Sequence, residues 1–124
     1  MKLRIHKNSV RLRLSQTEVD RIGKGLPVKE SLVLPGGDTN VLSYWLQTDD
    51  KAQEIGVQFA ENTILVTVPP ALASSWAFSD QVGMESNFRI ADDHELYLLI
   101  EKDFQCLHKR PGEDESDNFP HPEK

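Results

Sequence analysis

Residues 2–14 read KLRIHKNSVRLRL, and this stretch decides the fold class. Its apolar residues alternate with charged or polar ones and are Leu3, Ile5, Val10, Leu12 and Leu14. Alternation with a period of two puts the apolar side chains on one face of a β-strand and the charged ones on the other. The intervening Lys7-Asn8-Ser9 is typical of a turn, so we expect two antiparallel strands joined as a hairpin.

A short helix is expected directly after this hairpin. Ser15 and Glu18 have the spacing of a capping box, in which each side chain bonds the backbone N–H of the other residue. Gly23 and Gly25 supply an end about two turns later. A second short helix is expected after Pro69-Pro70, because the missing N–H of proline costs nothing in a first helical turn.

The remaining strands are expected at 29–34, 41–47, 55–59, 64–68, 84–90 and 96–101, where apolar residues alternate or cluster. Short links between consecutive strands favour antiparallel pairing. We therefore predict an α+β fold, with a mainly antiparallel curved sheet or a partly closed barrel of about seven to eight strands and two short helices. We identify no internal repeat in the sequence.

The length of 124 residues fits one domain, so we predict a single domain over 1–124, of which 110–124 form a polar, acidic tail. The lone cysteine, Cys106, cannot form an internal disulfide. No apolar run is long enough for a membrane helix, and the N-terminus lacks the apolar core of a signal peptide. We expect a cytoplasmic protein that does not bind membranes.

Charge is distributed unevenly along the chain. The formal net charge of −6 argues against nucleic acid as a partner. The first thirteen residues nevertheless contain five cations and no acid, and these are Lys2, Arg4, Lys7, Arg11 and Arg13. Residues 113–117 contain four acids.

The hairpin offers the first candidate site. Its alternation places one group of polar side chains on a common face, namely Lys2, Arg4, His6, Arg11 and Arg13. Arginine binds carboxylate or phosphate through two parallel hydrogen bonds, so this face is a candidate for binding an anion or an acidic partner. The alternative is an ordinary solvated sheet face, which is what such charges usually form.

The C-terminal region offers weaker candidates. Glu113, Asp114 and Asp117 supply oxygens for Ca²⁺ or Mg²⁺, although their spacing is not that of an EF-hand. Cys106 and His108 are candidates for zinc or for a nucleophile and its base, but a buried cysteine equally acts as a small apolar residue. We predict no firm metal site and no cofactor.

The acidic tail has two further interpretations. A run of like charges is usually solvated and disordered. The tail is also able to fold back onto the basic hairpin face, with Phe119 as a hydrophobic latch.

Four segments of the chain form a recognisable set: NSVRLRL at 8–14, DQVG at 80–83, EKDFQCL at 101–107 and EDESDNFP at 113–120. Together they resemble a family of small bacterial proteins classed as a domain of unknown function. The resemblance covers nearly the whole chain. It implies a bacterial origin but no activity, cofactor or site residue.

The leading functional interpretation is a non-enzymatic domain that binds a small ligand or a protein through the basic hairpin face. The expected partner is a second copy of the chain or an acidic protein. The alternative is a small anion- or phosphate-binding protein, or an enzyme, with an arginine-lined pocket and assistance from a metal. The first interpretation leads because the sequence contains no Ser-His-Asp pattern, no phosphate loop and no HExxH motif.

Overall fold

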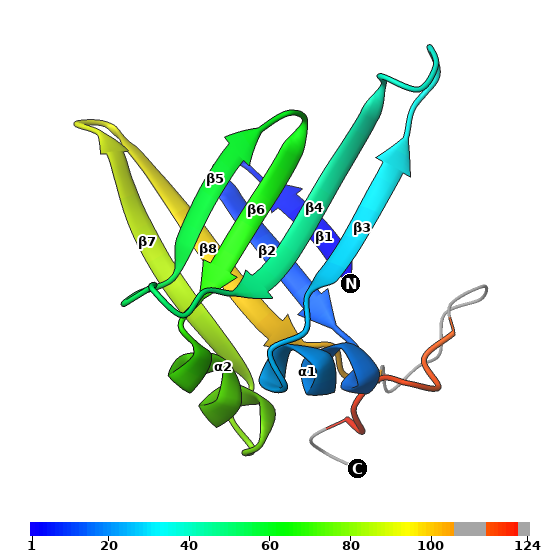
Figure 1. Cartoon of the computed structure of the whole chain (residues 1–124), viewed down its shortest axis with the longest axis vertical. Helices are drawn as coiled ribbons and strands as arrows, with labels where there is room; N and C mark the ends of the chain where they lie inside the picture. The colour runs from blue at the N-terminus through cyan, green and yellow to red at the C-terminus, as the bar shows by residue number, and fades with distance from the viewer. Residues whose placement is uncertain (106–113, 122–124) are drawn as a thin grey trace. The chain divides into compact units, whose positions relative to one another are not determined.

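The computed structural model describes residues 1–105 and 114–121. The strands within them are β1 (Lys2–His6), β2 (Ser9–Leu14), β3 (Val28–Val33), β4 (Val41–Thr48), β5 (Gly56–Ala60), β6 (Thr63–Val68), β7 (Gly83–Ala91) and β8 (His94–Lys102), as Figure 1 shows. The helices are α1 (Gln16–Gly23) and α2 (Pro70–Ala77). In this part of the chain no helix is long and apolar enough to cross a membrane.

The strands form two four-stranded sheets, sheet A in the order β1-β2-β8-β7 and sheet B in the order β3-β4-β6-β5. In each sheet two antiparallel hairpins join through a parallel pair of their second strands, β2–β8 in one and β4–β6 in the other. The α+β class, the mostly antiparallel pairing and the two short helices are confirmed. Neither sheet closes into a barrel, because each ends in two edge strands.

The chain divides into two compact units. Unit 1 comprises 1–19 with 81–124 and contains sheet A, whereas unit 2 comprises 20–80 and contains sheet B. Each unit has its own buried side chains. The prediction that the whole chain is one domain stays a prediction.

The two halves of the chain repeat one order of elements, ββαββ, over 2–48 and again over 56–102. Most equivalent positions lie 54 residues apart, as α1 begins at Gln16 and α2 at Pro70. Strand register follows the same rule. Ser9 lies opposite Tyr97 in sheet A, and 54 residues along from Ser9, Thr63 lies opposite Ser43 in sheet B. The structure therefore contains an internal repeat of elements that the sequence does not show.

The repeat is hidden because its positions keep their apolar character rather than their residues. Fully buried pairs of equivalent positions are Leu12 and Val66, Leu14 and Val68, Leu46 and Ile100, and Ile22 and Trp76. A core accepts different apolar side chains when the neighbouring residues compensate for the change in volume. Two halves that share a backbone pattern can therefore lose almost all identity in sequence.

Both termini of α1 have clear local causes. The Glu18 N–H donates to Ser15 Oγ at 3.4 Å and the Ser15 N–H to Glu18 Oε1 at 3.0 Å, which confirms the capping box. At the other end Gly25 has a φ of +82°, which glycine adopts without strain. Gly23 serves packing instead, because a Cβ there would lie 2.6 Å from the Cβ of Ala77.

Gly23→Ala should lower the free energy of unfolding by about 1–3 kcal/mol, because an added methyl group overpacks the contact with Ala77. The higher helix propensity of alanine, worth about 1 kcal/mol, offsets part of this loss. Urea denaturation measures the change. The neighbouring exposed substitution Lys24→Ala should stay within about 0.5 kcal/mol of the wild type. Equal stability of Gly23→Ala and the wild type would contradict a tight contact here.

Candidate functional site

The hairpin side chains predicted to share a face do so on sheet A. This basic face consists of Lys2, Arg4, His6, Arg11 and Arg13. Arg4 lies directly opposite Arg11, and Lys2 lies directly opposite Arg13, on the antiparallel pair β1–β2. The next strand, β8, places Glu101 beside Arg13. The alternation read from the sequence thus predicted the face, but not its acidic neighbour.

Acids at the end of β8 neutralise part of the basic face. Glu101 Oε1 lies 2.8 Å from the Nε of Arg13 and 3.8 Å from the Nε of Arg11. Lys2 Nζ lies 2.9 Å from Asp103 Oδ2. The Arg4 side chain makes no ion pair or hydrogen bond with any residue of 1–105 or 114–121. The carboxylates of Glu101 and Asp103 therefore pair with Lys2, Arg11 and Arg13. Arg4 has no acidic partner among the described residues.

The Arg4–Arg11 pair places like charges opposite each other. Like charges at directly opposed positions of an antiparallel pair destabilise it. Arg11 has only the longer of the two contacts to Glu101, and its side chain is 37% exposed. These two guanidinium groups are thus the least neutralised part of the face.

The equivalent hairpin of sheet B, β5–β6, has no cations at the corresponding positions. Those positions, 54 residues after Lys2, Arg4, His6, Arg11 and Arg13, are Gly56, Gln58, Ala60, Leu65 and Thr67. The register is the same, with Gly56 opposite Thr67. The cations are therefore a property of unit 1 and not a requirement of the hairpin.

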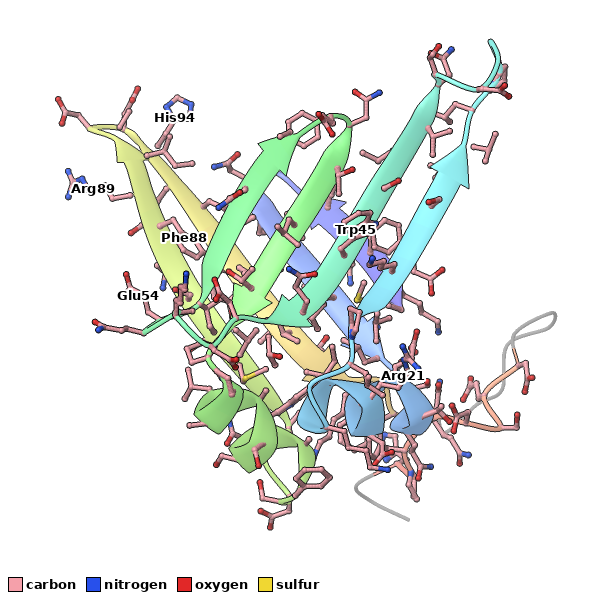
Figure 2. The ribbon with its side chains drawn as sticks, in the orientation of Figure 1. Arg21, Trp45, Glu54, Phe88, Arg89 and His94 are labelled. Atoms are coloured by element: carbon pink, nitrogen blue, oxygen red, sulfur yellow. The ribbon has the colours of Figure 1, made fainter. Side chains whose placement is uncertain are left out.

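In sheet B the strand beside β6 carries an aromatic residue, Trp45, opposite Leu65. Trp45 on β4, labelled in Figure 2, is the counterpart of Leu99 on β8. Lys29 Nζ lies 4.3 Å from the centre of its ring, a cation–π contact. The two outer faces thus share a backbone plan and differ in chemistry.

The described part of the tail, 114–121, packs on the rest of unit 1. The Phe119 N–H donates to the Asp103 carbonyl at 2.9 Å, and the Gln105 N–H donates to the Phe119 carbonyl at 2.7 Å. The Phe119 ring lies 5.8 Å from that of Phe104. Phe119 therefore holds the tail through Asp103, Phe104 and Gln105. The docking of the tail onto the basic face stays a prediction.

Asp117 lies at the N-terminus of α1. Its carbonyl accepts the Gln16 N–H at 2.8 Å, and its carboxylate accepts the Thr17 N–H at 3.3 Å. Hydrogen bonds from the side chains of Thr17 and Ser15 hold the pKa of Asp117 below its ordinary value of 3.8. The positive end of the helix dipole also stabilises a carboxylate at this position. The tail therefore supplies a cap from 100 residues away.

The two described acids of the predicted metal set, Asp114 and Asp117, both accept backbone hydrogen bonds. Asp117 serves α1, and Asp114 Oδ1 accepts the Ser116 N–H at 2.9 Å. Among the residues that the structure describes, no three His, Cys, Asp or Glu side chains are grouped to hold an ion. Cys106, His108 and Glu113 lie outside the described residues, so their candidacy stays a prediction.

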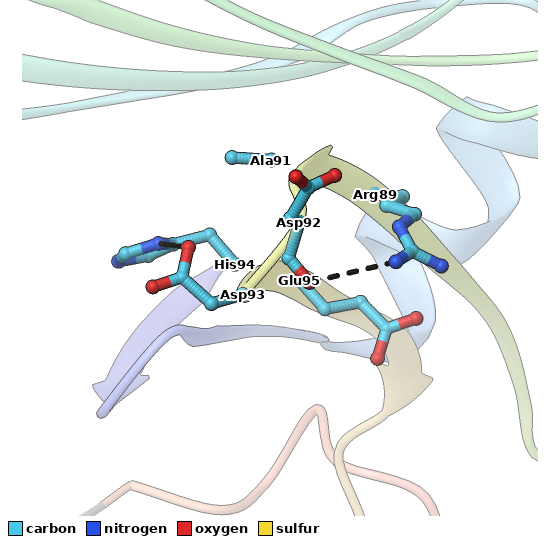
Figure 3. Close-up of a pocket in the computed structure, with 6 residues that line it drawn as sticks. All are labelled: Arg89, Ala91, Asp92, Asp93, His94 and Glu95. Atoms are coloured by element: carbon cyan, nitrogen blue, oxygen red, sulfur yellow. Dashed lines mark hydrogen bonds and ion pairs between the residues drawn. The ribbon is translucent and has the colours of Figure 1, made fainter.

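A cavity of about 290 Å³ lies at the β7–β8 turn, which the sequence marked only as a loop. Figure 2 labels Arg89 and His94 at this turn, and Figure 3 shows all the lining residues, which are Arg89, Ala91, Asp92, Asp93, His94 and Glu95. His94 Nδ1 lies 3.0 Å from the carboxylate of Asp93. The carboxylates of Asp92, Asp93 and Glu95 point in different directions in Figure 3, so the turn does not converge on a ligand.

The chain belongs to the family of unknown function DUF7009, whose model matches residues 1–123. The resemblance found in the sequence is thereby confirmed. No curated protein and no solved structure matches the chain. The family brings no known activity, cofactor or site residue with it.

Asp117→Asn should lower the melting temperature at neutral pH, because an uncharged amide loses the attraction between the carboxylate and the positive end of the helix dipole. The folded pKa lies below the unfolded one, so the contribution of Asp117 is complete above about pH 3.8 and is lost as the pH falls through the folded pKa. Melting curves across pH should show the variant and the wild type converging in acid. Asp50→Asn, at an exposed acid, should change little. A deficit that does not depend on pH would contradict the role of this charge.

Proposed function

We propose that this member of DUF7009 is a non-enzymatic binding domain whose basic face takes an acidic group of a protein partner. The observation that carries the proposal is the Arg4–Arg11 pair. Two guanidinium groups lie directly opposite each other, one with no acidic partner in the described chain and one 3.8 Å from a shared carboxylate.

A carboxylate suits this arrangement for a physical reason. Guanidinium groups are planar, always charged and weakly hydrated, and they hold carboxylate oxygens through two parallel N–H···O bonds. An anion placed between Arg4 and Arg11 also removes their mutual repulsion. Binding therefore gains both the new hydrogen bonds and the relief of an unfavourable contact already present.

The charge of the whole chain adds selectivity. A net charge of −6 means that most of the surface repels an acidic partner, whereas the basic face attracts it. Complementary potentials of this kind steer encounters and fix orientation more than they add affinity. An acidic protein would thus approach by one face.

The groups beside the cations favour binding over catalysis. Ser9 Oγ donates to the His6 carbonyl at 2.6 Å. The Tyr97 hydroxyl donates to Glu85 Oε2 at 2.6 Å, and this hydrogen bond raises the pKa of Tyr97 above its ordinary value of 10.0. A serine bonded to a carbonyl and a tyrosine held protonated are not activated nucleophiles. The support for an enzyme with an arginine-lined pocket is accordingly weaker.

A labelled oligoglutamate peptide tests the proposal by fluorescence anisotropy. We expect binding that weakens as salt is added, because screening reduces the attraction between exposed charges. Arg4→Gln should weaken it about tenfold, a loss of roughly 1.4 kcal/mol, and adding Arg11→Leu should weaken it further. Lys51→Gln removes an exposed cation from unit 2 and should leave binding unchanged.

Two results would contradict the acidic partner. One is equal binding by the wild type and the Arg4→Gln/Arg11→Leu variant. The other is a rise in melting temperature with inorganic phosphate or triphosphate, lost in the same variant, without any binding of the peptide. That second result would favour the alternative of a small anion-binding protein.

A further inference from the structure

The four edge strands of the two sheets differ in how they are protected. Exposed sheet edges invite pairing with other chains, and proteins usually discourage this with charges. Edge strand β1 carries Lys2 and Arg4, and edge strand β7 carries Glu85 and Arg89. The short β5 is followed at once by Glu61. In β3, by contrast, no charge follows Glu30 until Asp38.

The end of β3, Leu32 and Val33, and the following Leu34 are apolar on both faces of the sheet. Leu32 is 50% exposed, Val33 73% and Leu34 45%. Successive side chains of a strand point to opposite faces, so a partner beside this edge would find apolar contacts above and below it. Leu34 also borders a cavity of about 200 Å³ whose lining includes Leu42 and Phe59.

The backbone of this stretch directs bonding groups outward at alternate residues. The Leu34 N–H donates inward to the Asn40 carbonyl at 2.8 Å. Ser43, which lies opposite Ser31, donates its N–H away from β3 to the Asn62 carbonyl at 2.9 Å. Alternation in an antiparallel ladder therefore leaves the N–H and C=O groups of Ser31 and Val33 facing the open edge.

We propose that β3 of a second copy pairs antiparallel with this edge around a two-fold axis, with Leu32 opposite Leu32 of that copy. Opposed residues of an antiparallel pair share a face, so the axis passes through a residue rather than between two. In this register Ser31 of each copy lies opposite Val33 of the other copy. Each of these two pairs forms two N–H···O bonds, four in all.

Neighbouring registers are worse. An axis at Val33 sets Ser31 against Pro35, which has no N–H to donate. An axis at Ser31 brings the charged residues into the apolar stretch, with Glu30 against Leu32 and Lys29 against Val33. The Leu32 axis moves such contacts to the ends of the pairing, where Glu30 opposes Leu34 and Lys29 opposes Pro35. This axis therefore keeps Ser31, Leu32 and Val33 paired only with one another.

A second copy is the occupant that the charges favour. Residues 31–37 carry no charge that would select an acidic or basic partner, so the apolar end of β3 can pair with its own copy without opposing like charges. Two copies that each carry a net charge of −6 repel at long range, so the dimer should strengthen as salt is added. This is the opposite of the salt dependence expected for the basic face, so either proposal can fail without the other.

Sedimentation velocity over a range of protein and salt concentrations tests the pairing. The contact is smaller than the about 800 Å² per partner of standard interfaces, so we expect a weak dimer that grows with protein concentration and with salt. Leu32→Lys sets two cations directly opposite each other and should abolish the dimer. Val33→Pro removes only an outward N–H and should weaken it strongly. Ile5→Lys, at a residue of β1 that is 59% exposed, is the matched control and should leave it intact.

Disulfide formation tests the register. In a Cys106→Ser background, Leu32→Cys should cross-link two chains on mild oxidation, because opposed residues that are not hydrogen-bonded to each other lie about 4.5 Å apart at Cα. Val33→Cys should not, since its own counterpart lies diagonally, beyond about 7 Å. A monomer at every concentration, or equal cross-linking by both variants, would overturn the proposal.

Discussion

The parallel pairing of β2 with β8, and of β4 with β6, is the constraint on which the rest of the structure depends. Parallel strands cannot be joined by a tight turn, so each sheet takes one hairpin from each half of the chain. These central strands carry most of the fully buried residues, Leu12 and Leu98 in sheet A and Leu46 and Val66 in sheet B among them. Once the centre of each sheet is committed to packing, only outer faces and edges remain for recognition.

The repeat separates what the fold needs from what one unit adds. Hairpins β1–β2 and β5–β6 have the same register, but only the first carries a cluster of cations. Edges β3 and β7 occupy corresponding places, but the two charges of β3, Lys29 and Glu30, lie near its start, whereas those of β7, Glu85 and Arg89, are spread along the strand. A feature present in one copy of a repeated backbone and missing from the other is not there to maintain that backbone. The basic face and the uncharged end of β3 are the two clearest differences of this kind.

Local patterns predicted much of this structure, and long-range pairing explains what they missed. Alternation in 2–14 gave the hairpin and its basic face, and the Ser15–Glu18 spacing gave the cap of α1. Nothing near Ser9 indicates that it pairs with Tyr97, because tertiary packing decides that choice. The second cap of α1, Asp117, was missed for the same reason, and a carboxylate in a polar tail looks solvated until its partner is known.

The central claim is that the cations of sheet A serve binding and not folding. Its most direct test replaces four charged residues of sheet A with the residues at the equivalent positions of sheet B. The changes are Arg4→Gln, Arg11→Leu, Arg13→Thr and Glu101→Gln, and the equivalent residues are Gln58, Leu65, Thr67 and Gln47. Urea denaturation and oligoglutamate binding are measured on the same variant. The account predicts a free energy of unfolding within about 1–2 kcal/mol of the wild type, since each surface change is worth about 0.5 kcal/mol or less, together with loss of peptide binding. A variant that fails to fold, or one that still binds the peptide like the wild type, would contradict it.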